Sequence, residues 1–162
     1  MTDDNGTTVT EYTYDRNSNR LTKTMDGEIT SYIYNELNQL VSETGITYEY
    51  DLNGNLVKKI EGEQTTVYTY NAQNRLIRVT IQSGQSVNIE EYRYDYAGNR
   101  IAKIGELSTI NYLVDTNGVL SQVLAEYDEN GSLTTLYTRG DELISQERNG
   151  VKSYYLYDGF DS

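Results

Sequence analysis

One short pattern recurs along the 162-residue chain and constrains its fold more than any other feature. It reads Tyr-x-Tyr, then Asp or Asn, then a short loop rich in Asn and Gly, then Leu or Ile. Clear copies stand at 12–21, 32–40, 48–56, 68–76 and 92–101, with a weaker copy at 112–120 and a truncated copy at 126–133. Such repetition indicates one supersecondary unit used many times.

The spacing of the copies indicates that this unit is a β-hairpin. The leading tyrosines of the first six copies stand at 12, 32, 48, 68, 92 and 112, so the intervals of 20, 16, 20, 24 and 20 residues are all multiples of four. Lengthening both strands of a hairpin by two residues adds four to the period and keeps every side chain on its own face. We therefore expect two antiparallel strands per copy.

Turn residues stand at both ends of the expected hairpins. Asp or Asn after Tyr-x-Tyr can bind nearby backbone N–H groups, and Asn and Gly tolerate positive φ. Counted to the apolar residue, the loop is one residue longer in Asp15–Leu21 and Asp95–Ile101 than in Asp51–Leu56, so a bulge or wider loop is expected in those two copies. Copies in which Asn38 or Asn74 replaces Gly are expected to have weaker turns. The assigned turn residues are Asp15, Asp51, Gly54, Asn55, Asp95, Gly98, Asn99, Asp115, Gly118, Asp128 and Gly131.

The tyrosines are predicted to form a structural ladder. Tyr favours strands and suits a half-wet surface, and each aromatic–aliphatic cross-strand pair contributes roughly 0.2–1 kcal/mol. Ile46, Tyr48 and Tyr50 are expected to share one face, and on the returning strand Leu56, Lys58 and Ile60 are expected to share one too. The ladder is assigned to Tyr12, Tyr14, Tyr32, Tyr34, Tyr48, Tyr50, Tyr68, Tyr70, Tyr92, Tyr94, Tyr112, Tyr155 and Tyr157.

The predicted fold is all-β: tandem antiparallel hairpins forming one long sheet. Open twisted sheets rarely exceed about 10 strands without curling, so the sheet is expected to curve with its tyrosine face inward. The best helical candidate, Gly140 to Arg148, is short and begins at a glycine, and Tyr154-Tyr155 is expected to start a strand. No apolar run is long enough for a membrane span.

Composition excludes several kinds of chemistry. The chain has no His and no Cys, which removes Ser-His-Asp and Cys-His catalysis, disulfides and thiolate zinc sites. Its formal net charge of −12 disfavours binding to nucleic acid. Paired carboxylates could still serve a hydrolase, but no pair stands in a recognisable context, and Asp141-Glu142 is interpreted as a turn or the start of a helix. No cofactor is expected.

Two binding functions remain as alternatives. The loops at 15–19 and 51–55 place oxygen-bearing side chains at positions 1, 3 and 5, as in an EF-hand calcium loop. The sixth position holds Arg20 or Leu56, not the Gly of an EF-hand, so turn formation is the favoured interpretation. A row of tyrosine rings could also stack on sugars, which makes an extracellular carbohydrate-binding or adhesion module the main alternative function.

The copies YTYDRNSNRL, YIYNELNQL, YEYDLNGNL, YTYNAQNRL and YRYDYAGNRI resemble the YD repeats of the RHS family, which includes bacterial RHS proteins, components of insecticidal toxin complexes and teneurins. The resemblance is clear over 12–133, while Leu136 to Gly159 resembles the start of the RHS-associated core. It implies one single-domain segment: a lead-in at 1–11, repeats at 12–133 and a core-like stretch at 134–162. The family's protease residues have no match here.

The resemblance also implies a function. In the family such repeats wind into a hollow shell, which in many bacterial members encloses a C-terminal toxin. This chain is therefore expected to be a non-catalytic scaffold, a piece of a longer secreted or cell-surface protein. Its implied partners are the rest of the shell and an enclosed polypeptide. The two open sheet edges and the absence of Pro also predict some self-association.

Overall fold

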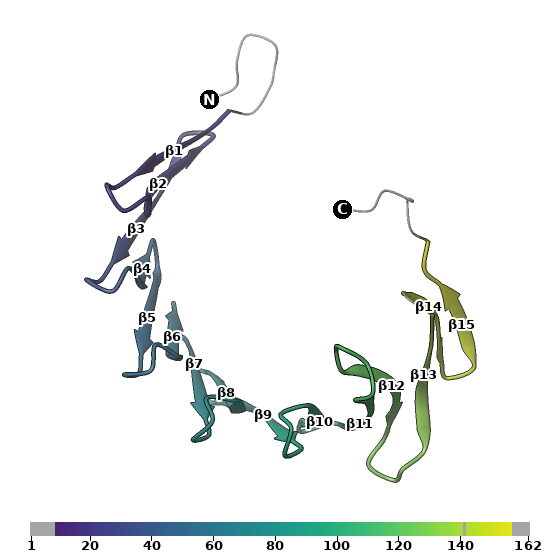
Figure 1. Ribbon diagram of the computed structural model, residues 1–162. Helices are drawn as coiled ribbons and strands as arrows, with labels where there is room; N and C mark the ends of the chain where they lie inside the picture. The colour runs from purple at the N-terminus through teal and green to yellow at the C-terminus, as the bar shows by residue number, and fades with distance from the viewer. Residues whose placement is uncertain (1–8, 141, 157–162) are drawn as a thin grey trace. The chain divides into compact units, whose positions relative to one another are not determined.

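The computed structural model describes residues 9–140 and 142–156. All the regular elements of these residues are strands, and each pairs with its neighbours in the chain, in the order β1 to β15 (Figure 1). The prediction of an all-β sheet of tandem antiparallel hairpins is confirmed. Among these residues no helix is long and apolar enough to cross a membrane. The strands are β1 Thr10–Tyr14, β2 Arg20–Met25, β3 Glu28–Tyr34, β4 Leu40–Glu43, β5 Ile46–Tyr50, β6 Leu56–Glu61, β7 Gln64–Tyr70, β8 Leu76–Ser83, β9 Ser86–Tyr94, β10 Arg100–Ile104, β11 Thr109–Asp115, β12 Gln122–Tyr127, β13 Leu133–Arg139, β14 Leu143–Arg148 and β15 Val151–Tyr154.

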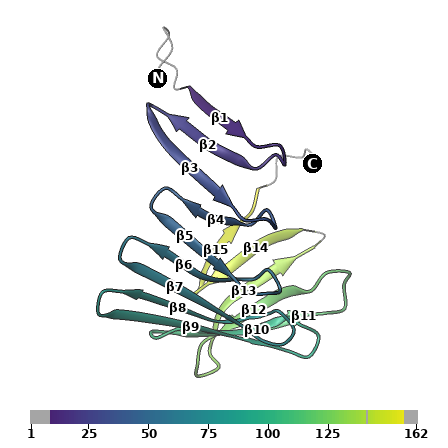
Figure 2. The same ribbon diagram turned by 90° about the vertical axis from the view of Figure 1, so that its left-hand side faces the viewer.

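Contacts divide the chain into two compact units. The first comprises residues 1–69 and 80–87, and the second comprises 70–79 and 88–162. Within each unit, neighbouring strands run in opposite directions and short turns connect them (Figure 2). Each unit is therefore built by the same rule, hairpin after hairpin along the chain.

The two faces of the strands differ in exposure. Along β5, Ile46, Tyr48 and Tyr50 are half-buried, while Thr47 and Glu49 between them are exposed. The predicted shared face of these three residues is confirmed. We call the face that carries Tyr48 and Tyr50, and the equivalent positions of other strands, the tyrosine face. Its shelter follows from strand geometry, because large side chains on alternate positions cover one another across neighbouring strands.

Full burial is rare. Among the described residues the buried apolar side chains are Tyr32, Ala102 and Ala125, and the buried polar ones are Thr66, Thr135 and Ser145. A sheet has no second layer to pack against unless another element covers it, so stability depends on cross-strand side-chain pairs and on the hydrogen-bond ladder.

The loops after Tyr-x-Tyr have one common length, contrary to the sequence-based expectation. Five residues separate Tyr14 from Arg20 and Tyr50 from Leu56, and the same count holds for the other clear copies. Arg20 and Arg100 therefore take the place expected for Leu21 and Ile101. The five-residue loops 15–19, 35–39, 51–55, 71–75, 95–99 and 128–132 are called Asx loops below, and their residues are numbered as positions 1 to 5.

A β-bulge accompanies these connections generally and is not confined to two copies, as had been expected. Register shifts occur between β1 and β2, β3 and β4, β5 and β6, β9 and β10, β11 and β12, β12 and β13, and β13 and β14. In β6 the shift makes Leu56 pair with Tyr50, whereas Lys58 pairs with Glu49. Leu56 and Lys58 thus lie on opposite faces, and the prediction that Leu56, Lys58 and Ile60 share a face is wrong.

Near the end of the chain the weak helical candidate is not a helix, and one expectation is wrong. The helical candidate is strand β14, Leu143–Arg148, which pairs with β13 and β15. Its alternating burial fits a strand, and the hairpin turn at Asn149-Gly150 continues the sheet. Tyr154 ends strand β15 and does not start one. The expectations for Asp141 and for Tyr157 lie outside the described residues.

Candidate functional site

The tyrosine face is the candidate site, and each assigned tyrosine from Tyr12 to Tyr112 lies in the first strand of a hairpin. Two of the leading tyrosines, Tyr48 and Tyr92, donate hydrogen bonds to carboxylates. The Tyr92 hydroxyl lies 2.7 Å from Glu90 Oε2, and Tyr48 donates to Glu43 in the same way. Tyr155, which follows β15, donates to Gln146 Oε1 at 3.1 Å.

A basic side chain completes the contact between Tyr92 and Glu90. Lys103 Nζ lies 2.8 Å from Glu90 Oε1, which forms the first acid–tyrosine–base network with Tyr92. Lys103 stands directly opposite Tyr92 in the ladder, so strand pairing alone brings the residues together. Lys59, which stands opposite Tyr48, pairs with a different carboxylate: its Nζ lies 2.6 Å from Glu61, whereas Tyr48 donates to Glu43.

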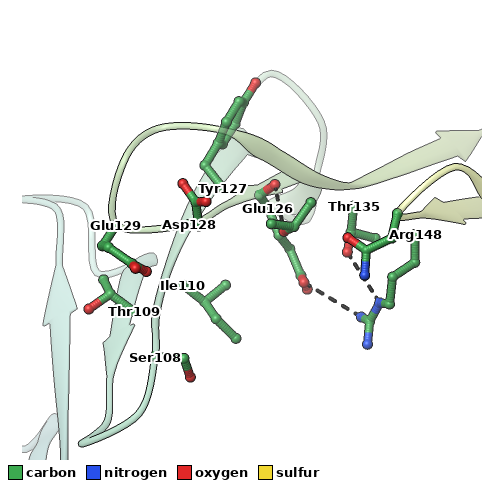
Figure 3. Close-up of a pocket in the computed structure, with 11 residues that line it drawn as sticks. Ser108, Thr109, Ile110, Glu126, Tyr127, Asp128, Glu129, Thr135 and Arg148 are labelled. Carbon is green, nitrogen blue, oxygen red and sulfur yellow. Dashed lines mark hydrogen bonds and ion pairs between the residues drawn. The ribbon is translucent and has the colours of Figure 1, made fainter.

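The second network lines a shallow pocket of about 240 Å³ on β11 to β14 (Figure 3). Glu126 accepts a hydrogen bond from the Tyr137 hydroxyl at 2.8 Å and lies 3.5 Å from Arg148 Nη2. Arg148 Nε also donates to Thr135 Oγ1 at 3.2 Å. Both carboxylate oxygens of Glu126 are therefore held by neighbouring strands, so the arrangement braces three strands.

These environments keep the tyrosines protonated. Burial, together with the bond to Glu90, raises the pKa of Tyr92 to about 12. Burial likewise raises the pKa values of Tyr48 and Tyr137, together with their hydrogen bonds to Glu43 and Glu126. Conversely, hydrogen bonds from Lys103 and then from Tyr92 lower the pKa of Glu90. At neutral pH the hydroxyls are donors and the carboxylate an acceptor, which suits a stable network better than proton transfer.

The second tyrosine of a hairpin bonds to the backbone of the preceding hairpin. The Tyr50 hydroxyl donates to the Leu40 carbonyl at 2.9 Å, and Tyr94 donates to the Leu76 carbonyl at 2.8 Å. Leu40 and Leu76 each begin a returning strand, next to an Asx loop. The hydroxyl, which needs a partner when its ring is half-buried, thus connects consecutive hairpins.

Two arginines lie between tyrosines where the sequence predicted Leu or Ile. The Arg20 guanidinium is 4.2 Å from the ring centre of Tyr32 and 5.7 Å from that of Tyr12. Arg100 lies 5.6 Å from Tyr92 and 5.5 Å from Tyr112. These are cation–π distances. Counting five loop residues after Tyr-x-Tyr, instead of counting to the next apolar residue, would have revealed both arginines.

Asx loops are held together by the side chain at position 1. Asp51 Oδ1 accepts hydrogen bonds from the backbone N–H groups of Asn53 (2.9 Å) and Asn55 (2.8 Å), and its Oδ2 accepts one from Asn55 Nδ2 (2.9 Å). The loops that begin at Asp15 and Asp95 have the same bond from position 5, which is the main cause of lowered pKa values for all three carboxyls.

Position 4 of the Asx loops has positive φ. Gly54, Gly98 and Gly131 have φ of 85°, 98° and 79°. Asn38 and Asn74 adopt the same left-handed conformation, at 58° and 57°, because Asn tolerates it better than most residues. The copies without Gly therefore keep the whole loop geometry.

The loop of the sixth copy is different. Asp115 accepts hydrogen bonds only from Asn117 among the described contacts, and Gly118 lacks the positive φ of position 4. Residues 116–121 separate β11 from β12, and Val123 pairs with Val114. Gly118 thus lies in a loop, as predicted, but this loop is not an Asx loop.

The calcium hypothesis requires free oxygen ligands. In both loops proposed for it, the carboxylate at position 1 already accepts hydrogen bonds from the loop. The described residues contain no group of three or more acidic side chains placed to hold a metal ion. The geometry supports the turn-forming role of Asp15 and Asp51.

Comparison with known proteins identifies the family. The family model described as Teneurin YD-shell matches residues 1–162, and the chain belongs to this family. It is 36% identical over 158 residues to the tRNA3(Ser)-specific nuclease WapA of Bacillus spizizenii, a match that covers 93% of this chain and 6% of that protein. The chain therefore corresponds to a small part of this relative.

Solved structures show the same fold. The crystal structure of TcdB2-TccC3-TEV is similar with a TM-score of 0.66 and 19% identity, over 91% of this chain and 9% of that one. The crystal structure of TcdB2-TccC3 without its hypervariable C-terminal region is similar with a TM-score of 0.67 and 18% identity, at the same coverage. The membership and the fold assign the chain a structural role as part of a YD-repeat shell.

Proposed function

We propose that this chain is a non-catalytic segment of shell wall in a longer secreted or cell-surface protein, and that the completed shell encloses a polypeptide cargo. The observation that carries the proposal is the tyrosine face itself. Its polar groups are engaged with one another across the strands, as in Glu90–Tyr92–Lys103, so the face is built for lateral cohesion. A wall of repeated hairpins needs such cohesion because it has no second layer.

We further propose that the tyrosine face lines the interior. Its side chains are the more sheltered set on β5 and on β7, where Thr66 is buried while Val67 and Thr69 are exposed. A single-layer wall that closes into a shell must bend toward one of its two faces. The direction of that bend determines which face the cargo meets.

Cysteine labelling of the full-length protein tests both proposals, because this chain contributes no cysteine of its own. Thr30 lies on the tyrosine face, because it pairs with Lys23 and Lys23 pairs with Tyr12. Thr47 is exposed on the opposite face. With other cysteines removed, Thr47→Cys should react with a bulky maleimide-polyethylene glycol, and Thr30→Cys should react only after denaturation.

The isolated 162-residue chain is the control, since both of its faces are open and both cysteines should react. Rapid labelling of Thr30→Cys in the intact full-length protein would contradict an inward tyrosine face. Equal labelling of both sites there would contradict a closed shell.

Carbohydrate binding is the competing function, and the hydrogen bonds of the tyrosine face weigh against it. The hydroxyls of Tyr48, Tyr92 and Tyr137 already donate to carboxylates, which leaves them less available to a sugar. Calorimetric titration of the chain with mono- and oligosaccharides should show no heat of binding. Saturable binding that is lost when Tyr12 and Tyr14, the most exposed of the paired tyrosines, are changed to Ala would favour the adhesion module.

A further inference from the structure

We propose that positions 4 and 5 of the Asx loops form a recognition code that decides which repeats can be neighbours. In three junctions, each within one compact unit, position 5 of one loop lies against position 4 of the next: Asn19 against Asn38, Gln39 against Gly54, and Arg75 against Gly98. The two positions alternate together in the sequence: Asn19 precedes Asn38, Gln39 precedes Gly54, Asn55 precedes Asn74 and Arg75 precedes Gly98. Short amides are followed by Asn, and long side chains are followed by Gly.

The first combination makes a hydrogen bond between repeats. Asn19 Nδ2 lies 2.9 Å from Asn38 Oδ1 and 3.0 Å from Asp15 Oδ2, so one amide group closes its own loop and binds the next one. Asn17 Nδ2 also donates to Asn38 Oδ1, at 3.1 Å. Because Asn38 has a φ of 58°, its side chain stands where it can accept both bonds. Gly at this position would offer no acceptor.

The second combination fills the same space with a long side chain. A Cβ atom at Gly98 would lie 2.6 Å from Arg75 Nη2 and 2.8 Å from Arg75 Cζ, closer than non-bonded atoms approach. Arg75 meanwhile donates from Nη1 to the Asp95 carbonyl at 3.3 Å and lies 5.9 Å from the Tyr94 ring centre. The guanidinium thus lies over the neighbouring turn, and a side chain at position 98 would have to displace it from its contacts with Asp95 and Tyr94.

The junction of Gln39 with Gly54 is a milder case. A Cβ at Gly54 would lie 3.4 Å from Gln39 Nε2, at the edge of ordinary contact. Gln39 also accepts a hydrogen bond from Asn35 Nδ2 at 2.7 Å, which closes its own loop. Gly131 provides the contrast within the same chain: its φ is +79°, and a Cβ there would meet nothing within 4 Å.

The code extends to any repeat that pairs with β1. Position 4 of the first Asx loop is Ser18, with a φ of 66°, so a side chain already occupies the place that Arg or Gln would need. A YD repeat that adds to this edge should therefore carry a short residue such as Asn at its position 5. This extension concerns the order of repeats and does not depend on what the shell encloses.

A double-mutant cycle on the 162-residue chain tests the code. We expect Gly98→Asn to lower the ratio of folded to unfolded protein about tenfold or more, and Arg75→Asn to lower it about two- to threefold. When both changes are combined, the ratio should recover to within about threefold of the original, because two Asn residues reproduce the first junction. Urea unfolding followed by circular dichroism gives the ratios.

Gly131→Asn is the matched control, because it also places Asn at a strongly positive φ (79°, against 98° at Gly98) but with no neighbour to displace, and its effect should be about twofold or less. Additive effects of Gly98→Asn and Arg75→Asn would overturn the proposal, as would a loss at Gly131→Asn equal to that at Gly98→Asn.

A second cycle covers the case in which Gly98→Asn prevents folding. Asn19→Arg alone should destabilise the chain, because the long side chain meets Asn38, and adding Asn38→Gly should restore stability by converting the first junction into the Arg–Gly type. Hydrogen exchange of the Ser18 and Asn38 amides, which donate to the carbonyls of Asp15 and Asn35, locates any opening. If Asn38→Gly further destabilises the Asn19→Arg variant, the two positions do not form a code.

Discussion

Two loops of this chain begin with almost the same residues and fold differently. The loop at 51–55 reads Asp-Leu-Asn-Gly-Asn, and the sequence from 115 to 119 reads Asp-Thr-Asn-Gly-Val. In the first loop, Asp51 accepts a hydrogen bond from the backbone of Asn55 and Gly54 has a φ of 85°. Strand β6 begins directly after the loop, at Leu56. In the second, Asp115 contacts Asn117, and β12 does not begin until Gln122.

The comparison shows that an Asp and a Gly at the right spacing do not suffice to form an Asx loop. Position 5 must donate its backbone N–H to the Asp side chain, and the following residue must pair with the second tyrosine, as Leu56 does with Tyr50. Val119 is instead fully exposed, and Val114 replaces that tyrosine, so the hydroxyl that connects hairpins is missing. The loop at 128–132 forms with Ser132 at position 5, so a side-chain amide is helpful but not essential.

The largest expected difference between the two loops concerns their aspartates. Asp51→Ala removes the acceptor of three hydrogen bonds that close its loop and should lower the free energy of unfolding several-fold more than Asp115→Ala, which removes only bonds from Asn117. Urea denaturation measures both. Asp51→Asn should retain most of the stability, since Asn35 and Asn71 lead equivalent loops. Equal losses at Asp51 and Asp115 would contradict the structural difference.

The next largest difference between the two loops should come from substituting their glycines. Gly54→Ala forces a side chain into the left-handed region and should cost about 1–2 kcal/mol, while Gly118→Ala, where φ is not positive, should stay within about 0.5 kcal/mol. Thermal melts of the two variants against the original chain make the comparison directly. A cost at Gly118 as large as at Gly54 would mean that the 116–121 loop resembles an Asx loop in solution.

Exchanging position 5 should have a smaller effect. Asn55→Val loses the bond from Nδ2 to Asp51 and should lower the free energy of unfolding by about 1 kcal/mol. Val119→Asn offers a side-chain amide donor to Asp115 and should raise the free energy of unfolding by a few tenths of a kcal/mol. Amide exchange of residue 118 reports whether a regular loop has formed. If Val119→Asn leaves exchange there unchanged, the missing second tyrosine is the dominant cause.

The smallest expected effect is the dependence on acidic pH. The pKa of Asp51 is lowered on folding, chiefly by the Asn55 side chain, so its carboxylate adds stability above its unfolded pKa near 4 and loses that contribution as pH falls further. Asp51→Asn should flatten the decline of stability below about pH 4. A carbon-detected NMR titration of Asp51 that gives an ordinary pKa would refute this.

The sequence predicted the strands and loops better than the contacts between them. The period of the tyrosines is enough to define hairpins, because a shift by one residue would turn a strand inside out. The bulges were missed in most copies, since nothing in the local residues distinguishes a bulged from a regular entry into the returning strand. The extra residue of each bulge shifts the returning strand by one position. This shift is why Arg20 and Arg100 lie on the tyrosine face and why Lys58 lies on the opposite face.

The networks on the tyrosine face were also beyond sequence analysis. Glu126, Tyr137 and Arg148 lie on three strands, and no spacing rule joins them. The pairing of Lys103 with Tyr92 was equally hidden, because the bulge between Arg100 and Ala102 changes which residue of β10 stands opposite. Glu90, Lys103, Glu126 and Arg148 are therefore specific members of networks with Tyr92 and Tyr137.

By itself, the sequence determined that the chain is all-β, that its unit is a hairpin, and where Asp, Asn and Gly close the turns, since these features depend on strand periodicity and on the conformational freedom of a few residues. The tertiary structure decided which side chains meet across strands. Register is a collective property of paired strands, and one bulged residue changes every partner that follows it.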